Sequence, residues 1–440
     1  MPELGILGIL VFTSTLLPGE ANLGINIGFG HIYPTDILLL FLLSLIFVRG
    51  SAEPNFKLVG TPLDIPLFGF VFIAFFSTMI AILFSSLTPQ QSFGEVRNIA
   101  NYLVFFAVTN LLRTKKQVKT LINGILALAS LVSVAMIVQY VLGPSNQLLP
   151  GRVEILVTEK SSFTDVTRII PPGYSLVFVA FIFLCVSHCY NEIKGHRFWL
   201  LMSWILTSLG VLLTFKRHFW VAVIMVFLLL IVLSKRNELK RIIGWLFSAS
   251  SIIIIGFALA VFVLGKPVLD LADSSVERLA SLTKPETYLN PNSSLRWRDF
   301  EYEYAYPQII AHPLLGLGLG AQYRPFVPHR DHANYDGRGF IHNGHVWIMV
   351  KTGLIGYFAM LCLIVLFLYR GFRYWNTLSD QTARAIGLGC TLVYLGMLVG
   401  TLVEPMLIER HWTALLAVIM GINETVIRLY GDHEQIPARG

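Results

Sequence analysis

The chain has few charged residues. Asp, Glu, Lys and Arg make up 13% of its 440 residues, whereas hydrophobic residues make up 55%. A soluble globular domain needs roughly 25% charged residues to cover its surface. The composition therefore excludes that class and predicts an integral membrane protein.

Cysteine is also scarce, and all four cysteines stand inside apolar runs: Cys185, Cys189, Cys362 and Cys390. No disulfide framework can then form among the polar loops. Cys185, His188 and Cys189 share a helical face, but a fourth metal ligand is missing, so buried packing is the better interpretation. Asp-x-Asp pairs, which often hold divalent ions, are absent from the loops predicted outside. We expect no metal ion and no cofactor.

Long apolar runs are what the sequence has in abundance. Most are roughly 17–25 residues long, enough to cross ~30 Å of hydrocarbon as a helix, and this is unlike the weak alternating pattern of a membrane β-barrel. We expect an all-α polytopic membrane protein with about twelve transmembrane helices. The predicted spans are 4–18, 34–49, 63–87, 97–112, 118–142, 172–190, 197–214, 217–233, 241–264, 343–369, 383–401 and 409–430. The first lacks the basic start and cleavage site of a signal peptide, so we expect it to remain a helix.

Lys and Arg are concentrated in one set of alternate loops, which the positive-inside rule places in the cytoplasm. Both termini are then cytoplasmic, and the segments around 19–33, 143–171 and 266–341 lie outside. The net charge of +7 is accordingly a topological signal. Nucleic-acid binding would need basic residues gathered on one soluble face, and we expect no nucleic-acid partner.

The longest polar interruption lies between two groups of predicted spans. Residues 1–265 are expected to form transmembrane helices one to nine, and residues 266–342 one large outside loop containing interfacial helices. Residues 343–440 then form the last three transmembrane helices and a short cytoplasmic tail. This loop is where we expect chemistry, because it ends at His342 where the chain re-enters the membrane.

A helix is predicted within this loop over 295–311, preceded by three residues suited to helix N-caps: Asn292, Ser293 and Ser294. His312-Pro313 ends it. Three glycines follow in Gly-Leu-Gly-Leu-Gly: Gly316, Gly318 and Gly320. They predict a tight turn that serves either close packing or a phosphate cradle, and close packing is the more common use.

His342 is the first candidate catalytic residue, because imidazole readily takes a proton near neutral pH. The alternative is an interfacial histidine that hydrogen-bonds the backbone. A second candidate is the basic run Lys216-Arg217-His218, which falls on the outside face where the positive-inside rule disfavours it. A diphosphate would account for this run, since the forked donors of guanidinium match phosphate oxygens. The alternative is that Arg217 reaches lipid headgroups.

Three further arginines stand in the loop. Arg296 and Arg298 lie on the predicted helix two positions apart, and such positions point roughly 200° apart, so at most one of them faces a shared site. Arg338 stands shortly before His342. These residues are candidate binding groups, with a solvated surface as the alternative for each.

Four motifs follow one another along the chain: Leu-Leu-Thr-Phe-Lys-Arg at 212–217, Arg298 followed by His-Pro-Leu-Leu-Gly-Leu-Gly at 312–318, His342-Asn343, and Lys-Thr-Gly-Leu-Ile-Gly at 351–356. Their order resembles that in the O-antigen ligase and O-antigen polymerase superfamily of bacterial envelope enzymes. The motifs cover residues from about 200 to 370, and the predicted topology of the whole chain is similar to that of the superfamily.

The resemblance implies a metal-independent, inverting glycosyltransferase of the bacterial inner membrane. Such an enzyme takes a glycan from undecaprenyl diphosphate at the periplasmic face and passes it to an acceptor hydroxyl. Carried over by motif, His342, Arg217 and Arg298 are the expected catalytic residues. The expected substrate-binding residues are Lys216, His218, Arg296, Arg338 and Asn343, with Lys216 standing where the family often has a small polar residue.

Four functions remain open, and one of them is a non-catalytic scaffold for envelope assembly, which a dispensable His342 would favour. Ligase activity, with a lipid A core acceptor, is favoured because one histidine and a few arginines fall on one dominant loop. A polymerase would use the same donor, and the 143–171 segment with Arg152 and Arg168 keeps that alternative open. A twelve-span secondary transporter is the alternative of another class, although no twofold repeat is apparent and acidic residues are nearly absent from the spans.

Overall fold

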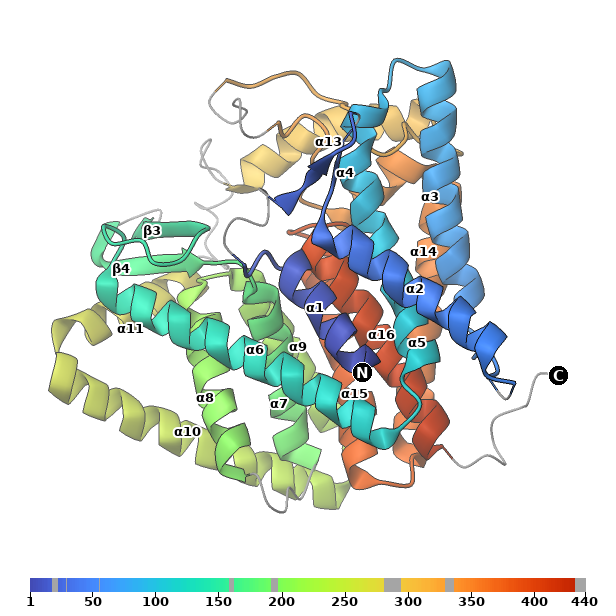
Figure 1. Cartoon of the computed structure of the whole chain (residues 1–440). Helices are drawn as coiled ribbons and strands as arrows, with labels where there is room; N and C mark the ends of the chain where they lie inside the picture. Colours follow the sequence, from blue (N-terminus) through green and yellow to red (C-terminus); the bar gives the residue numbers. More distant parts are fainter. Residues whose placement is uncertain are drawn as a thin grey trace. The chain divides into compact units, whose positions relative to one another are not determined.

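The computed structural model describes residues 1–17, 23–28, 30–54, 56–157, 162–190, 197–280, 294–328 and 336–431. These residues are mostly helical (Figure 1). The helices are α1 (Pro2–Thr13), α2 (Pro34–Ala52), α3 (Asp64–Phe84), α4 (Pro89–Ala100), η2 (Asn101–Leu103), α5 (Val104–Leu111), α6 (Lys115–Leu142), α7 (Tyr174–Tyr190), α8 (Arg197–Leu213), α9 (Arg217–Leu233), α10 (Arg236–Leu264), α11 (Lys266–Ala280), α13 (Ser294–Ala311), α14 (Gly344–Tyr374), η3 (Trp375–Thr377), α15 (Gln381–Gly400) and α16 (Arg410–Tyr430). The strands are β1 (Ile25–Asn26), β2 (His31–Ile32), β3 (Arg152–Val157) and β4 (Ser162–Ile170).

The helical membrane class predicted from composition is confirmed. Each predicted span coincides with a helix, or, at 97–112, with the end of α4 followed by η2 and α5. Among the described helices, α2, α3, α6, α10, α14, α15 and α16 are long and apolar enough to cross a membrane, while α1, α7, α8 and α9 are apolar but shorter. The total of twelve spans, the side on which each loop lies and the division at 265 and 342 stay predictions.

The large predicted loop contains two helices, α11 and α13. The helix expected over 295–311 is confirmed as α13, and Pro307 lies inside it. The predicted N-caps Asn292 and Ser293 lie outside the described residues, as do 281–293 and 329–335 as a whole.

The chain divides into two compact units. Unit 1 comprises Met1–Leu121, Pro291–Tyr374 and Met397–Leu429, and unit 2 comprises Ile122–Asn290, Trp375–Gly396 and Tyr430–Gly440.

Unit 1 is built around the packing of α3 against α14, which lie side by side (Figure 1). One face of α3 carries outward phenylalanines that stack along the helix: Phe68, Phe72 and Phe76. Its other face is buried and includes two hydroxyl side chains, Ser77 and Thr78. These buried hydroxyls need partners, because an unpaired polar group in an apolar interior costs free energy. In Figure 1, α13 lies across the upper end of this helix pair, and it contacts α14.

Unit 2 packs α7 against α8, α9 and α10. Phe178 of α7 stacks on Phe219 of α9, with ring centroids 4.1 Å apart and planes 19° apart. The antiparallel hairpin β3–β4 pairs Arg152 with Ile170, and it contacts α8 and α11 through β4. The hairpin thus covers the end of this helix group where α8 turns into α9.

Candidate functional site

The helix that follows His342 is interrupted at Gly353. Its φ of 66° and ψ of −174° are not helical, and an added Cβ would stand 2.1 Å from the Leu314 carbonyl oxygen, so only glycine fits. The break frees backbone groups that a continuous helix would pair internally. Loop residues take them up: Leu354 N–H donates to Pro313 O (2.7 Å), Ile355 N–H to Leu314 O (3.3 Å), Leu317 N–H to Val350 O (2.8 Å) and Gly318 N–H to Lys351 O (2.9 Å). The broken helix and the loop at 313–318 therefore hold each other in place.

The three loop glycines serve this close packing. Gly316, Gly318 and Gly320 have φ values of 67°, 83° and 86°. An added Cβ would stand 2.5 Å from the Val350 oxygen, 2.7 Å from the Ala81 Cβ and 2.4 Å from the Gln91 oxygen, respectively. All three of their N–H groups already donate within the protein, to the His312 carbonyl, the Lys351 carbonyl and the Glu95 carboxylate, respectively. A phosphate cradle needs such groups open to the ligand, so the geometry supports packing.

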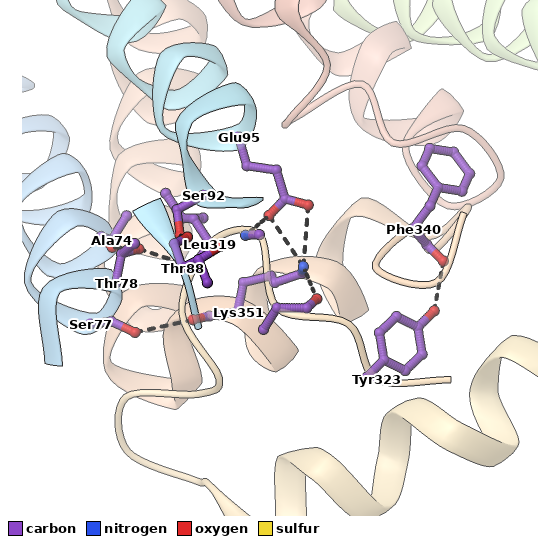
Figure 2. A network of polar contacts seen from close by, with 12 residues as sticks. Ala74, Ser77, Thr78, Thr88, Ser92, Glu95, Leu319, Tyr323, Phe340 and Lys351 are labelled. Carbon is purple, nitrogen blue, oxygen red and sulfur yellow. Dashed lines mark hydrogen bonds and ion pairs between the residues drawn. The ribbon is translucent and has the colours of Figure 1, made fainter. Parts of the chain in front are cut away.

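An ion pair between a buried lysine and a half-buried glutamate anchors the far end of the same loop (Figure 2). The Lys351 ammonium is fully buried, lies 3.2 Å from both carboxylate oxygens of Glu95, and donates to the Ala321 carbonyl at 2.5 Å. Beyond it, the Tyr323 hydroxyl donates to the Phe340 carbonyl at 2.7 Å. The anchored loop thereby reaches the residues that directly precede His342.

His342 is held by a buried carboxylate on α13. Its ring Nδ1 lies 2.8 Å and 3.0 Å from the two oxygens of Glu301, and its backbone N–H donates to the same side chain at 3.0 Å. The Glu301 side chain is 1% exposed, whereas that of His342 is 35% exposed. A carboxylate accepts from Nδ1–H, so Nε2 carries the ring's lone pair. His342 is therefore oriented by a side-chain partner, with an accessible ring that can accept a proton.

The two arginines at the start of α13 have different surroundings and different exposure. Arg298 is half-buried, and its Nη2 donates to the Val403 carbonyl at 3.0 Å. Arg296 is 63% exposed and lies 4.0 Å from Asp299, which is 61% exposed. Arg298 also stands three positions before Glu301, so the two residues share one face of the helix. Arg298 is thus the arginine on the side of His342.

Asn343 acts as the N-cap of α14. Its side-chain oxygen accepts from the N–H groups of His345 (3.0 Å) and Val346 (3.3 Å), and its amide nitrogen donates to the Tyr302 hydroxyl at 3.2 Å. These bonds satisfy backbone donors that a helix start leaves open. The cap also joins α14 to α13 beside His342, while the predicted contact of Asn343 with substrate stays a prediction.

Arg338 is paired at the surface. Its guanidinium donates to both oxygens of Asp336, with distances of 2.6 to 3.1 Å, and the two side chains are 36% and 42% exposed. Gln322 donates to the same carboxylate at 2.7 Å. This pair shapes the segment before His342, and substrate binding by Arg338 stays a prediction.

The basic run at 216–218 stands at the tight turn between α8 and α9 in unit 2. Phe215, just before it, has φ 49°, which is uncommon for a residue other than glycine, and its ring is buried against Leu156 and Val166 of the β3–β4 hairpin. Arg168 of β4 donates to the Thr214 carbonyl at 3.2 Å. The hairpin therefore fixes the backbone that presents the three basic residues.

These three basic side chains are not equivalent. Lys216 is 9% exposed, and its ammonium lies 4.1 Å from the ring centroid of Tyr174 and 5.5 Å from that of Phe219, so aromatic faces stabilise its charge. His218 packs edge-on against Phe219. Arg217 is the first residue of α9, where the helix dipole is positive and an anion would be stabilised. Arg217 and His342 belong to different units, and their shared site stays a prediction.

The structure gives no metal centre among the residues it describes, since no three of their His, Cys, Asp and Glu side chains are grouped closely enough to hold an ion. The cysteine pair of α7 lies beside His188, whose Nδ1–H donates to the Leu184 carbonyl at 2.8 Å. That histidine is engaged with its own helix.

Glu301 is the functional residue that the sequence reasoning missed. The sequence pattern that could have indicated Glu301 is its spacing of three residues from Arg298, which places Arg298 and Glu301 on one helix face, beside a stretch rich in aromatic residues. Lys351 was part of a recognised motif, but its partner Glu95 lies 256 positions away and carries no motif of its own.

Comparison with known proteins agrees with the motifs. The family model for O-antigen ligase matches residues 202–361, a segment that includes Arg217, Arg298, Glu301, His342 and the break in α14. No match to a curated protein was found. The resemblance predicted from the sequence is confirmed for residues 202–361, which match the O-antigen ligase family model and so support the O-antigen ligase superfamily.

Proposed function

We propose that this protein is a metal-independent, inverting glycosyltransferase that moves a glycan from undecaprenyl diphosphate to an acceptor hydroxyl at the periplasmic face of the bacterial inner membrane. The observation that carries the proposal is the His342–Glu301 pair, a histidine with an accessible ring whose other nitrogen is bonded to a buried carboxylate. The membership of residues 202–361 in the superfamily supports the substrate class.

In this mechanism His342 is the general base. The acceptor hydroxyl gives its proton to Nε2 as its oxygen attacks the anomeric carbon, and the bond from that carbon to the diphosphate oxygen breaks. Glu301 holds the ring in the required tautomer and stabilises the imidazolium that forms, the role a buried carboxylate has behind other catalytic histidines. Displacement by the hydroxyl from the opposite side inverts the anomeric centre.

The leaving lipid diphosphate takes the electron pair and gathers negative charge. Arg298, held on the His342 face of α13, and Arg217, at the positive end of α9, are the groups we assign to stabilise it. Both are always charged, so the mechanism requires no divalent ion. Lys216, held against two aromatic rings, adds a fixed positive charge beside Arg217.

The acceptor distinguishes a ligase from a polymerase. We favour a ligase with a lipid A core acceptor, because the histidine, its carboxylate and Arg298 all come from the one large loop. The polymerase alternative draws on the β3–β4 hairpin, which lies within the 143–171 segment and packs onto the turn that carries Arg217. A second outside loop would then share the site.

The test is transfer by purified full-length protein in proteoliposomes supplied with a lipid-diphosphate-linked glycan. Lipid A core, a second lipid-linked repeat unit and a protein acceptor are offered separately, and the glycosylated product identifies the acceptor. We expect wild-type transfer and none by His342→Ala at equal abundance and equal elution from a sizing column. Normal transfer by His342→Ala would end the general-base assignment, and dissipation of a solute gradient without transfer would favour the transporter.

A further inference from the structure

Unit 1 contains a cleft that His342 and Glu301 do not line. Its volume is about 690 Å³, within the range of small-molecule sites. It opens between the end of α3, the start of α4, the end of α13 and the loop at 312–322. This loop is the one that the glycines and Lys351 hold in place, so one wall of the cleft is rigid.

The lining is polar but uncharged. It combines amides and hydroxyls, including Gln91, Gln308, Ser85 and Ser86, with the His312 imidazole and apolar walls from α3 and the loop, and none of the lining residues is Asp, Glu, Lys or Arg. Within the described part of the chain, no hydrogen bond engages the side chains of Ser85, Ser86, Gln308 or His312. A diphosphate would call for cations, and a polyprenyl tail would leave the Gln308 amide and the hydroxyls of Ser85 and Ser86 unpaired. Neutral hydroxyl groups attached to apolar carbon faces match both parts of the lining.

The cleft and the His342 site share one face of α13. Gln308 follows Glu301 by seven residues, which is nearly two helical turns, so both point to the same side about 10 Å apart along the axis. Arg298 precedes Glu301 on that face, and His312 stands just after the helix end. The chemistry thus changes along a single stripe, from charged groups near His342 to neutral hydrogen-bonding groups at the cleft.

We propose that this cleft is a binding subsite for an uncharged segment of glycan, displaced along α13 from the reacting bond. Amides and hydroxyls would bind the sugar hydroxyls, and the apolar walls would contact the sugar ring faces. The inference rests on the proposed function for the source of the glycan, which is either the donor or the acceptor. The subsite would position that glycan so that its reacting end reaches His342.

The experiment compares three substitutions in the full-length protein. Gln308→Leu removes an amide at nearly constant volume, and Ser86→Trp fills the cleft. Gln90→Leu is the matched control, since Gln90 is exposed on α4 next to Gln91 and does not line the cleft. Initial rates of transfer are measured with the donor varied at fixed acceptor and then the reverse.

We expect Gln308→Leu and Ser86→Trp to raise the KM of one glycan substrate by about tenfold, with kcat within about twofold of wild type and Gln90→Leu unchanged. A raised acceptor KM assigns the cleft to the acceptor glycan, and a raised donor KM assigns it to the donor glycan. If Ser86→Trp keeps both KM values and kcat of the wild type, the subsite proposal is overturned.

A binding measurement separates the subsite from the reaction. Each glycan, freed from its lipid by mild acid, is added to His342→Ala protein, and saturation transfer from protein to sugar protons is recorded by NMR. One glycan should give a signal that is lost in His342→Ala/Ser86→Trp. A Ser86-sensitive signal without any wild-type transfer would sink the proposed function and keep the subsite, whereas wild-type transfer with a signal insensitive to Ser86→Trp would sink the subsite alone.

Discussion

The bond between Glu301 and His342 leads to the sharpest prediction, for the substitution Glu301→Gln. Glutamine keeps the size of the side chain but replaces one acceptor oxygen with an NH₂ donor. Glu301 now accepts from two N–H groups of His342, one on the ring and one on the backbone. In the variant, one of those two donors would face another donor, so the ring would lose either its tautomer or its orientation.

The expected size of the effect follows from the general-base role. A positioned general base contributes about 10²–10⁴ in rate, and the amide replacement of the aspartate behind a protease histidine costs about 10⁴. Because the remaining oxygen of the new amide can still accept from one of the two donors, we expect kcat to fall by about 10²–10³, or roughly 2.7–4 kcal/mol.

The assay is the proteoliposome transfer reaction under saturating donor and acceptor. Glu303→Gln is the matched control, since it makes the same change two residues along α13 at an exposed position and should leave kcat unchanged. A Glu301→Gln rate within about threefold of wild type would refute the positioning role.

Two other substitutions test the site and its support. Arg298→Lys should lower kcat by about 10–100-fold, since a point charge cannot reproduce the guanidinium fork. Arg296→Lys should keep a kcat near that of wild type, because Arg296 is exposed. Equal losses in steady-state transfer by the two variants would contradict the assignment of Arg298, and not Arg296, to the site. Gly353→Ala should lower the thermal unfolding midpoint by several degrees, because its Cβ would overlap the Leu314 carbonyl at a positive φ. Gly256→Ala on α10, where an added Cβ meets nothing within 4 Å, is its control, and an unchanged midpoint in Gly353→Ala by scanning calorimetry would refute the close-packing account.

The helices were largely predictable because bilayer-length apolar runs are local features of a sequence. The span predicted at 217–233 has the same bounds as α9, and that at 197–214 ends one residue beyond α8. The prediction at 97–112 missed most of α4, whose first turns are polar. Hydropathy cannot detect such a segment, and only a capping pattern signals it: Thr88 with Gln91 three residues later.

The site was predictable in its residue types and only partly in its arrangement. His342 and Arg298 were found from motif order and from their place in the one long polar loop. Motif order chose Arg298 and helical spacing showed that Arg296 faces away from it, but the hydrogen bond from Arg298 to Val403, 105 residues further along the chain, came only from the fold. The three glycines predicted a tight turn, whereas their partners on α3, α4 and α14 came only from the fold.

The sequence by itself determined that this is a helical membrane protein, that residues 202–361 resemble the O-antigen ligase family and that His342 is a candidate base, because hydropathy, charge and motif order can be read directly from the sequence. The tertiary structure decided which carboxylate orients that histidine, which arginine shares its helix face, and what the broken helix at Gly353 is for. These depend on contacts between residues 33 to 256 positions apart. Such contacts depend on how whole helices pack, and no local pattern of the sequence encodes which distant side chain will meet which.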